Sequence, residues 1–228
     1  MIKISISIQW LAHAAFKIKT NEKVIYIDPR YMKKFDNYIG SYFKNPEQAD
    51  IILFTHHHTD HCYPSSISKM SNSKTIFIGP ERCHERIGNK LRIIQVNEVI
   101  KINKIQIKAV HAYNIKRCRK NGGLFHPKGL RVGYLINIKG FTIYHAGDTE
   151  KIPEMDKFGK VDIAMIPIGD KFTMSIYEAI KATITIQPKI VIPMHNHESK
   201  PEEFKIKLET NTNISVKALE KGESFVFP

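Results

Sequence analysis

The chain has 228 residues, of which 42% are hydrophobic and 25% are charged, and this ordinary globular composition predicts one domain. Its three cysteines are too few and too scattered for a disulfide framework. No segment approaches the roughly 20 apolar residues of a membrane-spanning helix, and the first residues do not resemble a signal peptide. We therefore expect a cytoplasmic protein. The formal net charge of +13 favours anionic partners, although lysines dispersed over a solvated surface are the simpler explanation, because the basic residues are mostly dispersed.

Short apolar runs predict strands, and longer amphipathic stretches predict helices. The predicted strands are 3–10, 16–20, 23–28, 49–55, 74–79, 92–96, 98–103, 104–110, a hairpin over 130–147 that turns near Lys139-Gly140, 161–169, 189–195, and one or two strands within 215–227. The predicted helices are 65–72, 80–91, 174–187 and 200–211. The strands form two sets, each followed by helices, which indicates an α+β fold of two packed sheets with helices on the outer faces.

The segment "HHHTDH" follows the predicted buried strand 49–55 directly, and it is the strongest functional signal in the chain. Sites in α/β folds commonly lie at the carboxyl ends of strands. In an extended chain alternate residues point the same way, so His56 and His58 can converge on one metal ion while His57 turns away. Asp60 and His61 follow where the chain turns, and they can reach a second point nearby. Imidazole and carboxylate ligands suit zinc, manganese or iron.

This run resembles the signature of the metallo-β-lactamase superfamily, whose fold is a four-layer αββα sandwich. The segments "WLAHAAFKIKTNEKVIYIDP", "GLRVGYLI", "YHAGDTE", "VDIAMIPIGDKFTM" and "PKIVIPMH" resemble, in the same order, blocks of its UlaG-like or UPF0173-type metal-dependent hydrolases. The resemblance covers essentially the whole chain. It therefore implies a single hydrolase domain over residues 1–228.

The resemblance also implies the remaining ligands of a binuclear metal site. Asp148 matches an aspartate that commonly bridges two metals, and His195 matches the final histidine, with His197 as its nearest competitor. The third histidine is His111, which is favoured because it stands at the end of a predicted strand, or alternatively His126 in the block "HPKG". The implied first ion takes His56, His58 and His111 (or His126), and the second takes Asp60, His61 and His195. The expected cofactors are two divalent ions, zinc or manganese, with iron as a further candidate.

Three other residues are candidates for orienting these ligands: Asp28, His13 and His145. A turn-forming role for Asp28 and a packing role for the two histidines carry similar weight. Hydrolysis by a metal-activated water is the expected chemistry. Asp60 is the expected catalytic residue, which steers the nucleophile or accepts its proton.

The predicted irregular segment 113–129 is long for a loop, which makes it a functional candidate. Its Arg117, Arg119 and Lys128 are candidates for binding an anionic group, with a solvent-facing basic loop as the equal alternative. Relatives in this branch hydrolyse phosphorylated lactones and more distant ones phosphodiesters, so the expected substrate is a phosphorylated or otherwise anionic small molecule. A metal-dependent nuclease or phosphodiesterase acting on nucleic acid is one alternative, and a non-enzymatic metal-binding scaffold is the other. A homo-oligomer stays open.

Overall fold

The computed structural model describes residues 5–30 and 45–227, and the chain divides into two compact units. Unit 1 comprises Met1–Ile93 and Leu219–Pro228, and unit 2 comprises Ile94–Ala218. Each unit is built around one seven-stranded mixed sheet. No helix among the described residues is long and apolar enough to cross a membrane.

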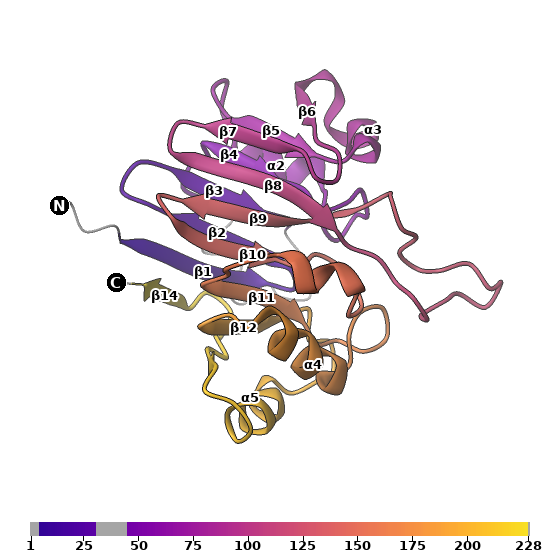
Figure 1. The fold of residues 1–228 in the computed structure, drawn as a ribbon. Helices are drawn as coiled ribbons and strands as arrows, with labels where there is room; N and C mark the ends of the chain where they lie inside the picture. The colour runs from indigo at the N-terminus through magenta and orange to yellow at the C-terminus, as the bar shows by residue number, and fades with distance from the viewer. Residues whose placement is uncertain (1–4, 31–44, 228) are drawn as a thin grey trace. The chain divides into compact units, whose positions relative to one another are not determined.

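The sheet of unit 1 has the strand order β14-β1-β2-β3-β4-β5-β6 (Figure 1). Pairing is antiparallel from β14 to β3 and parallel from β3 to β6. Because β3 and β4 are parallel, the residues that follow them, Asp28 and the 55–61 segment, lie at the same edge of the sheet. The strands are β1 (Ile6–Ala12), β2 (Ala15–Lys19), β3 (Val24–Ile27), β4 (Ile51–Leu53), β5 (Ile76–Gly79), β6 (Leu91–Ile93) and β14 (Ser224–Phe227).

Helix α2 (Pro64–Met70) confirms the helix predicted over 65–72 and begins with proline in its first turn. The single helix predicted over 80–91 is wrong. The structure has a 3-10 turn (Glu81–Cys83), the short helix α3 (His84–Ile87) and a second 3-10 turn (Gly88–Lys90). Gly88 has a positive φ of 68°, which ends α3 because an α-helix requires a negative φ. Residues 3 and 4 of the first predicted strand lie outside the described residues.

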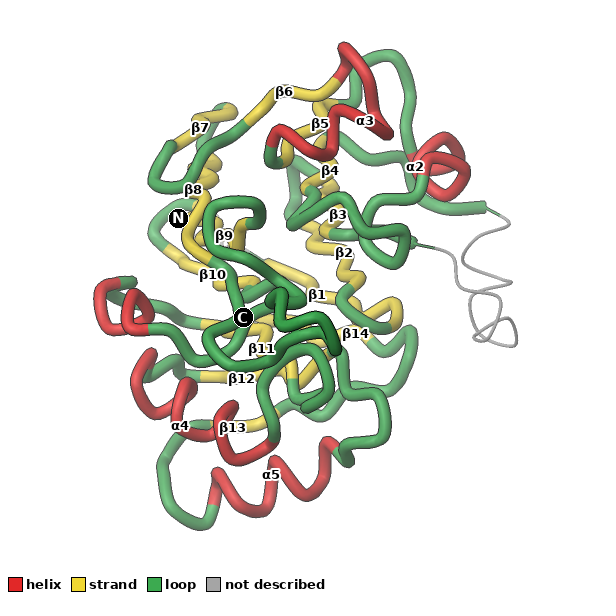
Figure 2. The backbone as a smooth tube through the Cα atoms, turned by 90° about the vertical axis from the view of Figure 1, so that its right-hand side faces the viewer, coloured by secondary structure: helices red, strands yellow, loops and turns green. Residues whose placement is uncertain are grey.

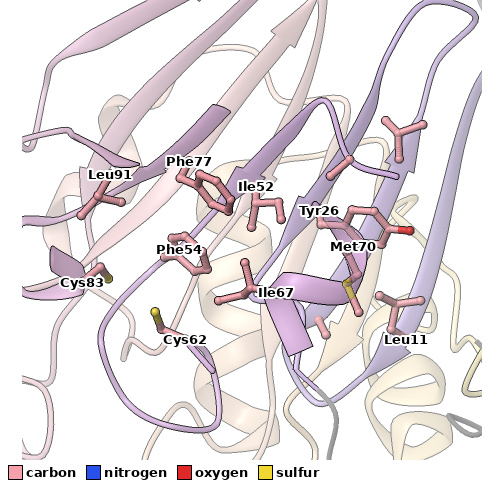
Figure 3. Close-up of a cluster of buried hydrophobic side chains, with 13 residues drawn as sticks. Leu11, Tyr26, Ile52, Phe54, Cys62, Ile67, Met70, Phe77, Cys83 and Leu91 are labelled. Atoms are coloured by element: carbon pink, nitrogen blue, oxygen red, sulfur yellow. The ribbon is translucent and has the colours of Figure 1, made fainter. Parts of the chain in front are cut away.

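An apolar cluster packs under the segment that follows β4 (Figure 3). The rings of Phe54 and Phe77 stack with centroids 6.5 Å apart, and Ile67 of α2 packs into the same cluster. Cys62 and Cys83 are both buried in it, and the hydrogen bond from the Cys62 thiol, together with burial, raises the pKa of Cys83 well above its usual range. Cys62 is therefore a core residue, and the cluster fixes both ends of the segment from Phe54 to Cys62.

The sheet of unit 2 has the order β13-β12-β11-β10-β9-β8-β7. It repeats the plan of unit 1: an antiparallel meander from β7 to β10 is followed by parallel strands from β10 to β13. The residues after β10 and β12, which include Asp148 and His195, therefore lie at one edge. The strands are β7 (Val99–Ile102), β8 (Ile105–His111), β9 (Val132–Ile138), β10 (Phe141–His145), β11 (Ile163–Pro167), β12 (Ile190–Met194) and β13 (Ser215–Val216).

The helices of unit 2 follow the predicted positions. Helix α4 (Ile176–Ile186) begins with a capping box between Ser175 and Glu178, and α5 (Pro201–Glu209) follows β12. Both helices contact strands of the parallel half, α4 against β11 and α5 against β12 and β13, and Figure 2 shows them on one side of these strands. The predicted hairpin turn is confirmed, since Lys139 and Gly140 both have positive φ. The 3-10 turn Pro153–Lys157 was not predicted.

Candidate metal centre

Asp28, directly after β3, is the anchor of the candidate ligands in unit 1. One of its carboxylate oxygens accepts the backbone N–H of Thr55 at 2.7 Å, and the other accepts the Thr55 hydroxyl at 2.6 Å. Asp28 is 1% exposed and has a positive φ of 47°. These bonds join the chain after β3 to the chain after β4. Asp28 therefore orients the residues that follow Thr55, and Thr55 is a site residue that the motif reading missed.

The same carboxylate sets the protonation of two candidate ligands. His61 Nδ1 lies 2.7 Å from Asp28 Oδ2, and His56 Nδ1 lies 3.0 Å from the Thr55 hydroxyl oxygen, whose proton goes to Asp28. Each Nδ1 is thus the N–H nitrogen, and each Nε2 carries the lone pair. The two rings lie 4.0 Å apart between centroids. Such carboxylate-oriented imidazoles are typical of histidines that bind metals.

His58 lies on the same side as His56, with ring centroids 4.7 Å apart. One ligand atom of His56 lies within 4.8 Å of one of His58, and the same holds for His56 with His61. The carbonyl of His57 accepts a hydrogen bond from Arg86, which helps to hold the loop. The alternation that the sequence predicts thus corresponds to the contact between His56 and His58.

A third group in unit 1 comprises His13, Asp60 and His61. One ligand atom from each lies within 4.8 Å of the other two. His13 Nε2 is 3.3 Å from Asp60 Oδ2, and His61 Nε2 is 3.8 Å from the same oxygen. Asp60 is the most accessible of the three, with 36% of its side chain exposed.

In unit 2, Asp148 lies between two histidines. Its Oδ2 is 3.3 Å from His126 Nε2, and its Oδ1 is 3.3 Å from His195 Nε2. All three side chains are at most 3% exposed. Asp148 thus offers a different carboxylate oxygen to each of the two histidines.

Backbone geometry presents Asp148 and His195 at the ends of their strands. The N–H of Gly147 donates to Nδ1 of His145, which shapes the turn before Asp148 and occupies that nitrogen. His145 therefore stabilises the turn that leads to Asp148. Gly169, after β11, must lack a side chain because a Cβ there would lie 2.1 Å from the His195 carbonyl oxygen. His195 itself has a positive φ of 48°.

The contacts of His126 and His111 differ. The Nδ1 of His126 lies 3.1 Å from the Phe172 carbonyl oxygen, which can only accept, so Nδ1 carries the proton and Nε2 the lone pair. His111 ends β8, is half-buried, and packs its ring against Tyr113. Among the described residues its buried Nδ1 has no hydrogen-bond partner. The structure thus brings His126 to Asp148 and shows no such contact for His111.

Buried Glu150 organises the loop that carries His126. Its carboxylate accepts the consecutive backbone N–H groups of Ile115, Lys116 and Arg117 at 3.0, 3.0 and 2.7 Å. The N–H of Asn114 donates in turn to the His126 carbonyl at 2.8 Å. Sequence reasoning missed Glu150, although it stands two residues after Asp148.

The basic residues predicted to bind substrate have different surroundings. Arg117 is ion-paired with three carboxylates, those of Glu150, Asp170 and Glu178. Burial alone would lower the pKa of Arg117, but these hydrogen bonds outweigh burial and raise it. These ion pairs show that Arg117 holds the loop in place within unit 2.

Lys128 is also engaged, through an ion pair of 2.6 Å with Glu154 and a position over the Tyr113 ring. Burial would raise the pKa of Glu154, but the bond from Lys128 prevails and lowers it to about 2. Arg119 is exposed, as are Lys116 and Lys120. Lys128 is exposed as well, although its ammonium pairs with Glu154.

The donor atoms fit a bound cation. In a neutral His126 with its proton on Nδ1, the Nε2 lone pair faces a carboxylate oxygen at 3.3 Å, a spacing that a cation between the two atoms, a metal ion or a proton, makes favourable. His61 Nε2 and Asp60 repeat the arrangement. A set of imidazoles and carboxylates suits zinc, manganese and iron, so these residues define a candidate metal-dependent enzyme.

Comparison with known proteins agrees with this class. The family model described as the β-lactamase superfamily domain matches residues 7–195. A UPF0173 metal-dependent hydrolase of Staphylothermus marinus is 34% identical to this chain, and the alignment covers 97% of this chain and 99% of the relative. A UPF0173 metal-dependent hydrolase of Methanosarcina mazei is 32% identical, and the alignment covers 96% of this chain and 97% of the relative. The crystal structure of a protein from Parabacteroides distasonis, assigned as a metal-dependent hydrolase, is 30% identical with a TM-score of 0.84, covering 94% of this chain and 92% of its own.

The chain belongs to the metallo-β-lactamase superfamily. It is a metal-dependent hydrolase with the predicted α+β fold of mixed sheets and flanking helices.

Proposed function

We propose that this hydrolase acts on a phosphorylated or otherwise anionic small molecule, a lactone or a phosphodiester, at a binuclear metal centre. The observation that carries the binuclear centre is Asp148, whose two oxygens each face the Nε2 of a different histidine. The contact with Asp148 favours His126 over His111 as the third histidine. In this proposal the first ion takes His56, His58 and His126, the second takes Asp60, His61 and His195, and Asp148 bridges them as in UlaG-like enzymes.

When bound, two divalent ions of zinc, manganese or iron would lower the pKa of a water toward neutrality and polarise the bond under attack. The protein's own groups hold this chemistry in place. Asp28 keeps the proton of His61 on Nδ1, and Thr55 does the same for His56. Asp60, the most accessible residue of the group His13, Asp60 and His61, accepts the proton of the attacking water or orients that water.

The net charge of +13 and the exposed Lys116, Arg119 and Lys120 support an anionic substrate. Arg117 and Lys128 are omitted from the proposed substrate-binding set because internal carboxylates engage them. The proposal therefore gives substrate recognition to Arg119 and its neighbours in the loop.

Elemental analysis of the purified protein, combined with hydrolysis assays, tests the proposal. The substrates are a phosphorylated lactone, bis(p-nitrophenyl) phosphate and a single-stranded oligonucleotide. We expect about two metal ions per chain and turnover of a small anionic substrate, and we expect His58→Ala and Asp148→Asn to lose both. His84→Ala is the matched control, since the His84 side chain is exposed and contacts Asn89.

A metal-replete, fully active His58→Ala protein would exclude the proposed centre. Cleavage of the oligonucleotide alone, weakening steeply with salt, would replace the small-molecule substrate with nucleic acid. A metal-loaded protein that hydrolyses none of the three substrates would favour the alternative of a non-enzymatic metal-binding scaffold.

Cytoplasmic location forms part of the proposal. The thiols of Cys62, Cys83 and Cys118 are all free, which agrees with a reducing compartment. A homo-oligomer stays a prediction, which sedimentation of the purified chain would test.

A further inference from the structure

We infer that His13 is itself a metal ligand, so that unit 1 supplies two histidines and one carboxylate, His13, Asp60 and His61, to the second ion. This inference rests on the proposed metal centre and extends it, because neither the HHHTDH motif nor the bridging aspartate includes His13. His13 would add one imidazole to the ligands that the proposed centre gives its second ion, and imidazole and carboxylate ligands suit zinc, manganese and iron.

The distances between histidine nitrogens and carboxylate oxygens fall into two groups. His61 Nδ1 lies 2.7 Å from Asp28, which is a charge-assisted hydrogen bond. His13 Nε2 lies 3.3 Å from Asp60 Oδ2, which is a long hydrogen bond and the same spacing that His126 and His195 have from Asp148. Two ligand atoms that each lie about 2.1 Å from one ion at a tetrahedral angle are about 3.4 Å apart. The spacing of His13 and Asp60 matches that of two ligands on one ion.

The orientation of the ring agrees with ligation. The His13 ring lies edge-on to the His61 ring, with centroids 5.3 Å apart, and the side chain is 8% exposed. Its Nε2 lies 3.3 Å from Asp60 Oδ2, and the Nε2 of His61 lies 3.8 Å from the same oxygen. Both imidazoles therefore present a ring nitrogen to the same carboxylate oxygen.

The backbone holds His13 in an unfavourable conformation. Its φ is 56°, in the left-handed region that residues other than glycine rarely adopt. The buried indole N–H of Trp10 donates to the His13 carbonyl at 3.0 Å and stabilises the turn between β1 and β2. Strain of this kind persists where the surrounding structure imposes it, and it is concentrated at functional sites.

The competing role for His13 is to donate a hydrogen bond to Asp60 without touching the metal. Two substitutions separate these roles. His13→Gly removes the ring and suits the positive φ, so the turn is retained. His13→Gln keeps an N–H donor near the position of Nε2 but supplies only a weak amide ligand.

The experiment is titration of the metal-stripped full-length protein with Co²⁺, following metal stoichiometry, affinity and the visible absorption of the bound ion. The wild type, His13→Gly, His13→Gln and the control His84→Gln are compared. We expect both His13 variants to lose one Co²⁺, or to bind it more than about 100-fold more weakly, since loss of an orienting partner alone costs roughly 10–100-fold. We also expect the visible absorption bands of the Co²⁺ that stays bound to differ from those of the wild type.

A His13→Gln protein with the wild-type affinity and spectrum would overturn the inference in favour of a hydrogen-bonding role. A His13→Gly protein that binds both ions with an unchanged spectrum would overturn it as well, and in both cases the proposed centre would stand. Failure of the wild type to bind Co²⁺ would instead contradict the proposed function and the inference with it. Far-UV circular dichroism of each variant reports whether it is folded.

Discussion

The Nδ1 of His61 lies 2.7 Å from Oδ2 of Asp28, and neither side chain is exposed to solvent. The same carboxylate accepts two bonds from Thr55, so one buried aspartate orients both His56 and His61. Asp28→Asn replaces an acceptor oxygen with an N–H donor, and the amide cannot accept all three bonds. We expect the metal affinity to fall by roughly 10–100-fold.

Asp50→Asn is the matched control for Asp28→Asn in a metal titration. Asp50 also accepts a backbone N–H across the sheet, from Val24 at 2.8 Å, but it pairs with Lys23 rather than with a histidine. We expect Asp50→Asn to change the free energy of unfolding and to leave the metal affinity unaltered. Equal losses of affinity in the two variants would show that Asp28 acts through folding alone.

The two candidates for the third histidine give opposite expectations. His126 faces Asp148 at 3.3 Å, whereas His111 packs against Tyr113. We expect His126→Ala to contain about one metal ion fewer and His111→Ala to keep the wild-type content, measured by elemental analysis after dialysis against a metal buffer. The reverse result would restore His111 as the ligand.

Glu150 should be important for the order of the 113–129 loop. Glu150→Gln places an amide N–H against three backbone donors, which costs about 1–3 kcal/mol for each buried donor left unsatisfied. We expect faster hydrogen exchange at Ile115, Lys116 and Arg117 and weaker metal binding through His126. Glu154→Gln is the control, because Glu154 pairs with the exposed Lys128 in the same loop. Unchanged exchange in Glu150→Gln would mean that other contacts hold the loop.

The ion pair of Arg117 with Glu178 predicts a dependence of stability on pH. Burial alone would raise the pKa of Glu178, but the hydrogen bond from Arg117 outweighs burial and lowers it. A lowered pKa in the folded state stabilises the protein above the unfolded-state pKa of about 4.3, and this contribution disappears as the pH falls toward the folded-state value.

The measurement is urea unfolding of the metal-free wild type and Glu178→Gln at several pH values. Glutamine can preserve the capping box with Ser175, so the substitution mainly removes the charge. We expect Glu178→Gln to be less stable by about 1 kcal/mol at pH 7, with the difference shrinking below about pH 4. A difference that stays constant with pH would assign the effect to the helix cap.

The sequence predicts the residues at strand ends well because local patterns determine them. A buried strand followed by a histidine run placed His56 and His58 correctly at the end of β4, and the Lys139-Gly140 turn follows from the conformations that glycine permits. The helix over 80–91 was wrong because its apolar periodicity concealed the effect of Gly88 on the backbone.

The long-range partners could not be predicted in the same way. Whether Arg117 is a substrate-binding residue depends on Asp170 and Glu178, more than fifty positions further along the chain. The choice between His111 and His126 depends on Glu150 and on the Phe172 carbonyl, which meet only when unit 2 is folded. Irregular loops lack the periodicity that would reveal such partners.

The pairing of β14 with β1 has a consequence for biosynthesis. Residues 224–227 complete the sheet of unit 1 beside β1, yet the ribosome makes them after the whole of unit 2. At roughly 5–20 residues per second, β1 would keep an unpaired edge for on the order of ten to forty seconds. An exposed strand edge invites pairing with other chains, so the nascent polypeptide is most prone to aggregate during that interval.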